Sequence, residues 1–240
     1  MLLALDIGNT RTKLGWFDGQ ALVVAEHLPT ADAPSLPADR EVEVAVLSGV
    51  VPDALDAWRD WLGARGVPVR CVGRDLAVPL TIDYNPPESL GADRLLGALA
   101  AARRHGAPVL TADCGTATTL TVVATGGVFV GGTIGCGLST QRDALAHEAA
   151  LLPALDLEPP TAVLGRDTLA CLRSGLVLAH AGMISWLAQR LRAEANLPGA
   201  PLVATGGHAP LLARALPGLF AEVDPHLVLH GLALAHWETV

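Results

Sequence analysis

Cysteine pairs are absent from this 240-residue sequence, because none of its four cysteines forms a Cys-x-x-Cys motif with another. A zinc knuckle needs such paired ligands, and a disulfide-stabilised secreted domain needs a much higher cysteine content. We therefore expect four small buried hydrophobic side chains in a cytoplasmic protein, namely Cys71, Cys114, Cys136 and Cys171.

Basic residues are also few, since 16 lysines and arginines stand against 24 aspartates and glutamates and leave a formal net charge of −8. Binding to nucleic acid or to a membrane surface generally requires a basic field, so we expect neither partner. The chain opens with a strand-like apolar segment rather than the basic start of an export signal. The longest weakly polar run, residues 174–188, is shorter than the ~20 residues that span a bilayer, and we interpret it as a buried helix.

Apolar residues dominate what is present, at 51% of the chain, whereas only 17% of the residues are charged. This balance indicates an α/β protein whose sheets are covered by helices on both faces. In the first half, strand-like apolar segments and turn residues predict a three-stranded meander followed by helix-linked strands. The expected strands span residues 2–7, 12–17, 21–27, 42–47 and 68–72, and the expected helices span 52–64 and 90–104.

The second half repeats this plan, which indicates an internal duplication. A shift of 107 residues superimposes four pairs, Asp6 on Asp113, Gly8 on Gly115, Thr12 on Thr119 and Gly19 on Gly126. Strands are expected at 109–113, 118–124, 128–133 and 201–204, and helices at 139–151, 167–194 and 226–237. We therefore predict two lobes with a cleft between them, an N-terminal lobe at residues 1–107 and a C-terminal lobe at residues 108–240.

Two short motifs at strand ends indicate the chemistry of the two halves. In Asp6-Ile7-Gly8-Asn9-Thr10, a carboxylate precedes a glycine that allows close backbone approach, and then come amide and hydroxyl donors. The counterpart is Asp113-Cys114-Gly115-Thr116. Opposed carboxylates can hold hydrated Mg²⁺ while backbone N–H groups bind phosphate oxygens. A single Asp-x-Gly is more often an ordinary turn, whereas two in register predict a nucleotide phosphate site.

Lys13 is the only lysine in the chain, and it follows the first motif within the expected hairpin. An ammonium group at this place is either a point charge for the phosphates or a solvated lysine on a strand.

Residues 84–94 form a turn-rich segment that brings Asp93 and Arg94 to the first turn of an expected helix. A carboxylate there can accept the proton of an attacking hydroxyl, as phosphoryl transfer requires, and the guanidinium can bind an anionic group. The alternative is an acidic helix start beside an arginine, which is a common surface feature. Tyr84, the only tyrosine, is either a substrate contact or a buried loop aromatic.

Taken together, these segments resemble the type III pantothenate kinase family, which includes the Bvg accessory factor proteins. The resemblance covers nearly the whole chain, in order and in spacing. It rests on Asp6-x-Gly8-Asn9-Thr10, Tyr84-Asn85-Pro86, Gly91-x-Asp93-Arg94, Asp113-x-Gly115-Thr116-Ala117, Gly131-Gly132-Thr133-Ile134, Gly165-Arg166-Asp167-Thr168, Thr205-Gly206-Gly207 and the segment from Asp224 to Leu232. The family belongs to the actin and sugar kinase superfamily, so the resemblance implies two ribonuclease H-like lobes.

The resemblance further implies ATP-dependent phosphorylation of pantothenate to 4'-phosphopantothenate, the first step of coenzyme A biosynthesis, with Asp93 as the general base. Pantothenate would contact Tyr84, Gly91, Ala92, Arg94 and Thr168, the last reaching the site of the neighbouring subunit in a homodimer. ATP would contact Asp6, Gly8, Asn9, Thr10, Lys13, Gly115, Thr116, Thr118, Gly206 and Gly207. Mg²⁺ would bind Asp6 and Asp113, and members also tend to require a monovalent cation, K⁺ or NH₄⁺.

Three positions depart from the family pattern. Thr121 stands where many members carry aspartate, Cys136 where proline is usual and Asp167 where asparagine is common. The first departure leaves the monovalent cation requirement open. A nucleotide-binding accessory or regulatory protein with weak or no kinase activity remains an alternative, as does another small kinase or a polyphosphate phosphatase. The eight histidines share no ligand spacing, and we interpret them as structural or surface residues.

Overall fold

The computed structural model describes residues 1–37, 40–149, 152–153 and 155–239. Within it the chain divides into two compact units. The first unit comprises Met1–Ala100 together with His226–Val240, and the second comprises Ala101–Pro225. Each unit has its own sheet and its own hydrophobic core.

The sheet of the first unit has the strand order β3-β2-β1-β4-β5. The first three strands form an antiparallel meander, whereas the last two run parallel to the first. Their bounds are β1 Leu2–Ile7, β2 Arg11–Asp18, β3 Ala21–Pro29, β4 Val44–Gly49 and β5 Val69–Cys71. Every strand expected in this half of the chain is therefore confirmed, with ends that differ by up to two residues.

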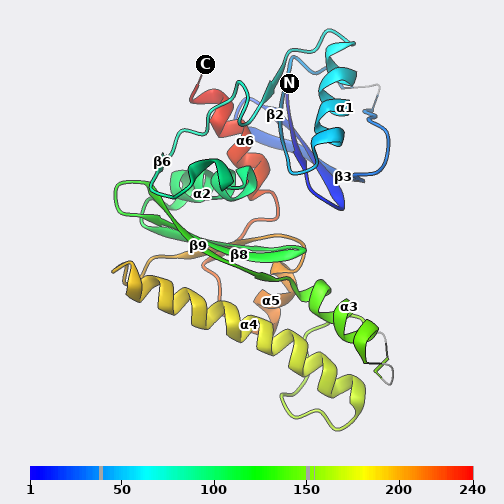
Figure 1. Cartoon of the computed structure of the whole chain (residues 1–240), viewed down its shortest axis with the longest axis vertical. Helices are drawn as coiled ribbons and strands as arrows, with labels where there is room; N and C mark the ends of the chain where they lie inside the picture. Colours follow the sequence, from blue (N-terminus) through cyan, green and yellow to red (C-terminus); the bar gives the residue numbers. More distant parts are fainter. Residues whose placement is uncertain (38–39, 150–151, 154, 240) are drawn as a thin grey trace. The chain divides into compact units, whose positions relative to one another are not determined.

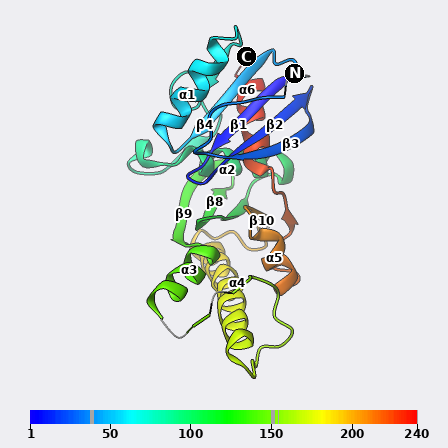
Figure 2. The same cartoon turned by 90° about the vertical axis from the view of Figure 1, so that its right-hand side faces the viewer.

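Helices bury both faces of this sheet (Figure 2). Leu3 and Leu5 of β1 pack with residues of α1 (Pro52–Gly63), which begins with proline as its sequence predicts. Leu2 and Ala4 face the other way and pack with α2 (Ala92–His105) and α6 (Leu227–Trp237). The period-two alternation of the strand therefore fills two separate apolar layers.

The second unit repeats the arrangement, and its own five strands lie in the order β11-β10-β7-β8-β9 within a six-stranded sheet. Its strands are β7 Val109–Cys114, β8 Ala117–Ala124, β9 Val128–Cys136, β10 Leu202–Thr205 and β11 Glu222–Val223. Two helices, α3 (Leu138–Glu148) and α4 (Thr168–Glu194), lie in sequence between β9 and β10, and α5 (Ala209–Ala215) follows β10 (Figure 1). The duplication predicted from the sequence is thus present in the connectivity of both sheets.

Even an irregularity of the meander is duplicated. In β3 the pairing with β2 slips between Trp16 and Phe17 and leaves Val23 without a cross-strand partner. In β9 the pairing with β8 slips between Val122 and Val123 and leaves Val130 in the same position. Each slip is a β-bulge, in which one strand contributes an extra residue. Two bulges at the same place indicate that the two halves share one ancestral hairpin.

The shift of 107 residues that relates the two halves does not hold for the second strand of each half, where the shift is 106 residues. The turn between β1 and β2 holds residues 8–10, whereas the turn between β7 and β8 holds only residues 115–116. As a result Thr12, opposite Ile7, corresponds to Thr118, opposite Cys114, and not to Thr119. One residue fewer in the turn moves the following strand by one position.

The sequence missed four short elements, whereas the long helix expected at 167–194 is confirmed as α4 to within one residue. The missed elements are β6 (Thr81–Ile82), the 3₁₀ turn at Pro87–Ser89, α5 and β11, each too short to show periodicity. The helix expected at 139–151 is α3, and the end expected for it lies outside the described residues. The buried run at 174–188 belongs to α4, which has 27 residues.

α4 is, among the described helices, the one long and apolar enough by length and composition to cross a membrane. One face of it is nevertheless part of the core of the second unit. Val177, Ala181, Ile184 and Ala188 pack there against Leu120 and its neighbours on the sheet. The prediction of a helix with buried residues is therefore confirmed for this face.

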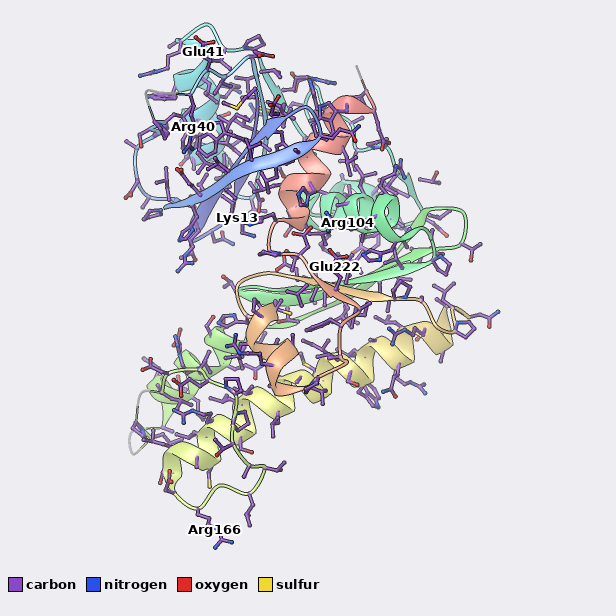
Figure 3. All side chains as sticks on the ribbon, turned by 180° about the vertical axis from the view of Figure 1, so that it is seen from behind. Lys13, Arg40, Glu41, Arg104, Arg166 and Glu222 are labelled. Carbon is purple, nitrogen blue, oxygen red and sulfur yellow. The ribbon has the colours of Figure 1, made fainter. Side chains whose placement is uncertain are left out.

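The helix α6 groups with the first unit although the expected C-terminal lobe at 108–240 included it. Val228, Leu229 and Leu232 contribute to the apolar layer between the first sheet and α2. Helix α2 itself ends in the second unit, where Arg104 Nη1 lies 2.6 Å from Glu222 Oε1 and 2.7 Å from Asp224 Oδ2 (Figure 3). The compact units thus differ from the expected lobes at the last helix, and the domain boundary at 107 remains a prediction.

Two glycines of the first unit provide a test of the close contact between α2 and α6. A Cβ atom at Gly231 of α6 would overlap the backbone of Leu96, whereas one at Gly97 would lie 3.9 Å from the nearest atom, in Leu227. We expect Gly231→Ala to lower the free energy of unfolding by about 2 kcal/mol through overpacking. Gly97→Ala should be neutral or stabilising by up to ~1 kcal/mol, because alanine favours the helix.

Urea denaturation of both variants measures this difference. Equal stability of the two variants would contradict the close approach of the two helices at Gly231.

Candidate functional site

The carboxylate of the first half lies near the end of β1. Asp6 is directly opposite Lys13 in the β1–β2 ladder, and Asp6 Oδ2 lies 3.8 Å from Lys13 Nζ. The side chains are 14% and 31% exposed, so the pair is partly shielded from water. Figure 3 shows Lys13 on the strand that follows the turn. The only lysine of the chain is therefore held beside the first motif by strand register, rather than lying free in solvent.

The turn between β1 and β2 presents its polar tip to solvent. Gly8 N donates to Arg11 O at 3.1 Å, which closes the turn. Thr30, which the sequence reading missed, donates through its hydroxyl to Gly8 O at 2.8 Å. Asn9 and Thr10 are exposed at the tip. Backbone and hydroxyl donors in such a turn can bind an anion without a large movement of the chain.

The second motif occupies the equivalent turn of the second unit. Asp113 lies at the same position of β7 as Asp6 in β1, and Gly115 N donates to Ala117 O at 3.0 Å. Thr116 is exposed, and its carbonyl accepts hydrogen bonds from Gly137 N at 3.0 Å and Thr140 Oγ1 at 2.7 Å. The start of α3 therefore braces this turn from one side.

The Thr205-Gly206-Gly207 segment lies beside the Asp113 turn within the second unit. Thr205 of β10 is paired with Asp113 of β7, and His208 N donates to Cys114 O at 3.1 Å. Gly206 has a φ of +88°, and a Cβ atom there would collide with the Asp113 carboxylate and the Cys114 backbone. Only glycine fits this approach. The structure thus brings together five predicted residues of the second unit, namely Asp113, Gly115, Thr116, Gly206 and Gly207.

Thr118, in contrast, points into the protein interior. Its side chain is 1% exposed, and its Oγ1 lies 2.9 Å from Nε2 of His180 on α4. Thr121, three residues further along β8, is also buried. The direct ATP contact predicted for Thr118 remains a prediction, and the structure places its hydroxyl against a buried histidine.

The predicted general base and substrate residues gather at the start of α2 in the first unit. Asp93 is in the first helical turn, and its Oδ1 accepts a hydrogen bond from Arg94 N at 2.9 Å. Gly91 precedes the helix directly before Ala92, and a larger residue there would press on the Asp93 carboxylate. The Arg94 side chain is buried, with its guanidinium carbon 5.6 Å from the centre of the Tyr84 ring. Such a contact is a cation–π interaction and fixes the guanidinium plane.

Thr168 belongs to the second unit and begins α4. The preceding residue, Asp167, caps the helix by accepting a hydrogen bond from Ala170 N at 2.8 Å. Thr168 is exposed, and so is Arg166, which projects from the loop before the helix (Figure 3). Aspartate caps a helix as well as asparagine does, so the departure at position 167 leaves the local structure intact.

The four cysteines do not share one environment, which corrects the expectation that all are buried. Cys71 and Cys114 are buried, and burial raises the pKa of the Cys114 thiol to about 12. Cys136 and Cys171 are exposed. Cys136 is the last residue of β9, and Cys171 lies on an exposed part of α4. The hydrophobic pattern around each cysteine is not strictly periodic, so the sequence did not show which face it lies on.

No group of three or more histidine, cysteine, aspartate or glutamate side chains that could hold a metal ion occurs among the described residues. Asp6 and Asp113 belong to different compact units. Their joint coordination of Mg²⁺ therefore stays a prediction, and so does the cleft that the sequence placed between the lobes.

One sheet plan is used twice, with an aspartate at the same position of each first strand, and this arrangement has the fold of the actin and sugar kinases. Solved structures agree with this class. A putative Baf family transcriptional activator from Campylobacter jejuni superimposes with a TM-score of 0.62 at 18% identity, covering 98% of each chain. A ROK hexokinase from Thermus thermophilus gives a TM-score of 0.52 at 17% identity, covering 100% of this chain and 99% of that one.

Within this class the chain belongs to the type III pantothenate kinase family. The family model described as type III pantothenate kinase matches residues 2–190. The type III pantothenate kinase of Rubrobacter xylanophilus is 38% identical over 258 residues, covering 98% of this chain and 97% of that protein. That of Frankia alni is also 38% identical and covers 98% of both chains. The resemblance and the fold class predicted from the sequence are thereby confirmed.

The contact of Gly206 with Asp113 can be tested with a matched pair of glycines. Gly206 and Gly218 have nearly the same backbone conformation, with φ values of +88° and +83°, but only Gly218 has open space around its Cα. We expect Gly218→Ala to cost about 1 kcal/mol of stability because of its positive φ. Gly206→Ala should cost more and should also weaken ATP binding at least tenfold, since the new methyl group displaces the Asp113 carboxylate.

Thermal unfolding and calorimetric titration of ATP measure the two effects. The same ATP affinity in both variants would show that the position of Asp113 does not depend on Gly206.

Proposed function

We propose that this protein phosphorylates pantothenate with ATP and forms 4'-phosphopantothenate, the first step of coenzyme A biosynthesis. The observation that carries the proposal is family membership along nearly the whole chain, combined with Tyr84, Asp93 and Arg94 at the start of one helix. A chain that only binds nucleotide has no need of a buried arginine and a carboxylate beside each other at this place.

ATP would bind through its phosphates at the two motif turns. The exposed tips at Asn9, Thr10 and Thr116 offer hydroxyl and amide donors, and Lys13 adds a positive charge. Gly206 and Gly207 would lie near the adenosine. In phosphoryl transfer the protein chiefly positions the reactants and stabilises charge, and fixed turns with few side-chain rotamers suit that task.

The metal ion of the reaction would be held by Asp6 and Asp113. Both provide carboxylate oxygens, the donor type that Mg²⁺ prefers, and one or two carboxylates with water and phosphate oxygens are its usual ligands. When bound, the ion would neutralise phosphate charge. A monovalent cation, K⁺ or NH₄⁺, is a further part of the proposal, and we expect only a weak dependence on it because Thr121 brings no negative charge.

Asp93 would accept the proton of the pantothenate hydroxyl as that oxygen attacks the terminal phosphorus. The hydrogen bond from Arg94 N to Asp93 Oδ1 fixes the orientation of the carboxylate, so Oδ2 is the oxygen that would accept the proton. The buried guanidinium of Arg94 would pair with the carboxylate of pantothenate, and Tyr84 would flank the bound substrate. A charge that is removed from water binds an opposite charge more strongly than one on the surface.

The active protein would be a homodimer in which Thr168 contacts the substrate of the neighbouring subunit. Support comes from the outward face of α4, where Gly175, Ala179, Gly182 and Trp186 are exposed one helical turn after another. Trp186 alone is 61% exposed, and exposed tryptophan is typical of protein interfaces rather than of free surface.

Replacement of Trp186 by lysine tests the proposed subunit contact. We expect Trp186→Lys to shift the protein from dimer to monomer in sedimentation velocity experiments, because a charge would be buried in an apolar contact. Val23→Lys is the matched control, since Val23 is also an exposed hydrophobic residue but lies on β3. A dimer that persists in Trp186→Lys would exclude this face of α4 as the interface.

The general base is tested by Asp93→Asn. We expect kcat to fall about 100-fold or more, since the amide cannot accept the proton, while calorimetric ATP affinity stays within about twofold of wild type. Asp53→Asn is the control, because Asp53 is the second residue of α1 just as Asp93 is the second residue of α2. Near-normal turnover by Asp93→Asn would refute the assigned role.

An ADP-release assay with and without pantothenate distinguishes the kinase from the alternative, a nucleotide-binding accessory protein. A kinase gives pantothenate-dependent ADP formation, whereas a nucleotide-binding regulator gives ATP binding without it. The absence of pantothenate-dependent ADP formation by the wild-type chain would favour the alternative.

A further inference from the structure

A buried histidine in the middle of α4 is bound on both ring nitrogens. His180 is 1% exposed; its Nε2 lies 2.9 Å from Thr118 Oγ1 and its Nδ1 lies 3.1 Å from Gln141 Nε2. The three residues come from three elements of the second unit, α4, β8 and α3. Burying so many polar groups is costly unless each finds a partner, so the set is a defined network and not a chance contact.

The direction of each hydrogen bond in this network follows from Gln141. Its Nε2 also donates to the Cys136 carbonyl at 3.0 Å, and a reversed amide would place two oxygens against each other. Nδ1 of His180 must therefore accept the hydrogen bond from Gln141, so the proton of the neutral imidazole is on Nε2 and is donated to Thr118 Oγ1. Burial and the neighbouring His208 lower the pKa of His180 to about 4, in agreement with a neutral ring.

The network adjoins the Gly115–Thr116 turn of the second motif without including the turn residues themselves. Thr118 follows that turn at the start of β8. The Gln141 side chain donates to the carbonyl of Cys136, and the next residue, Gly137, donates through its backbone N to the Thr116 carbonyl at 3.0 Å. Gly137 has no room for a side chain because the carbonyls of Gly115 and Thr116 press against it. His180 thus contacts both sides of the turn, through Thr118 on one side and through Gln141 on the other.

We propose that His180 is a positioning residue for nucleotide binding: by holding Thr118 and Gln141 it fixes the Gly115–Thr116 turn in the shape that binds the ATP phosphates. The proposal rests on the proposed function and deepens it for the second motif. His180 does not touch ATP, and it exchanges no proton during the reaction. Its effect is on the affinity for the nucleotide and not on the chemical step.

An apolar residue at position 180 removes the network and is the first test. We expect His180→Leu to raise the KM for ATP and the calorimetric dissociation constant of ATP about tenfold, since the order of the turn would depend on it. The KM for pantothenate should stay within about twofold of wild type. His180→Gln, whose amide can donate to Thr118 and accept from Gln141, should restore most of the ATP affinity.

The KM for ATP distinguishes the proposed positioning role of His180 from a role in protein stability alone. Loss of folded protein lowers the concentration of active enzyme and hence the apparent kcat, but it leaves the KM of the molecules that remain folded unchanged. His147→Leu is the control, because His147 is an exposed histidine on α3. A His180→Leu variant that is folded and has an ATP KM within twofold of wild type would overturn the proposal.

Gln141→Ala gives an answer even where His180→Leu does not fold. It keeps the imidazole and its bond to Thr118 but removes the side-chain bonds that join His180 Nδ1 to the Cys136 carbonyl next to Gly137, so we expect a rise of about threefold or more in the ATP dissociation constant. Unchanged ATP affinity in this variant would likewise overturn the proposal. Because ATP binding is measured without pantothenate, these outcomes are independent of the phosphate acceptor. A wild-type chain that binds ATP but fails to phosphorylate pantothenate refutes the proposed function and not the role of His180.

The predicted tautomer has a spectroscopic signature. Nitrogen-15 NMR of the wild-type protein at pH 7 should show His180 as a neutral ring with the proton on Nε2. A charged ring, or a proton on Nδ1, would contradict the arrangement on which the proposal depends.

Discussion

Burial of the central strands on both faces is the constraint from which the site follows. In β1 and in β7, five of six residues are buried, and the single exception in each is the aspartate near the strand end. A strand between two apolar layers can carry charged groups at low cost only where the layers end, at its edges and in the turns that follow. The carboxylates and the donors around them are therefore confined to the carboxyl ends of the first strand of each unit, and each turn can be shaped by its neighbours without disturbing the core.

The sequence predicted most of the sheets and the motif residues because both are encoded locally. The apolar runs that form the strands and the glycines of the turns between them are visible in short windows. What it could not predict depends on distant partners. Thr118 is buried because His180, 62 residues later, takes up its hydroxyl. The same limit applies to α6, because its apolar residues do not indicate which sheet they pack against. It also applies to the one-residue difference in length between the two turns, which only the strand registers reveal.

The two halves support equivalent turns by different means. In the first unit the Thr30 hydroxyl donates to the Gly8 carbonyl, so a single residue directly after β3 supports the turn. In the second unit two helices follow β9, and the task is taken over by Gly137, which precedes α3, and by Thr140 and Gln141 of α3. Duplication thus kept the strand plan while the bracing of each turn diverged. The second turn is consequently connected to α4, which also carries the proposed subunit contact at Trp186.

The β-bulge at Val23 has a consequence for how the protein behaves in concentrated solution. β3 is the outermost strand of the first sheet, and such a strand offers unpaired N–H and C=O groups to any extended peptide that meets it. The extra residue bends the strand and breaks the even spacing of those groups, so a second chain cannot extend the sheet in register. The irregularity protects a hydrophobic edge against fibrous self-assembly while leaving the residues of the turn in place.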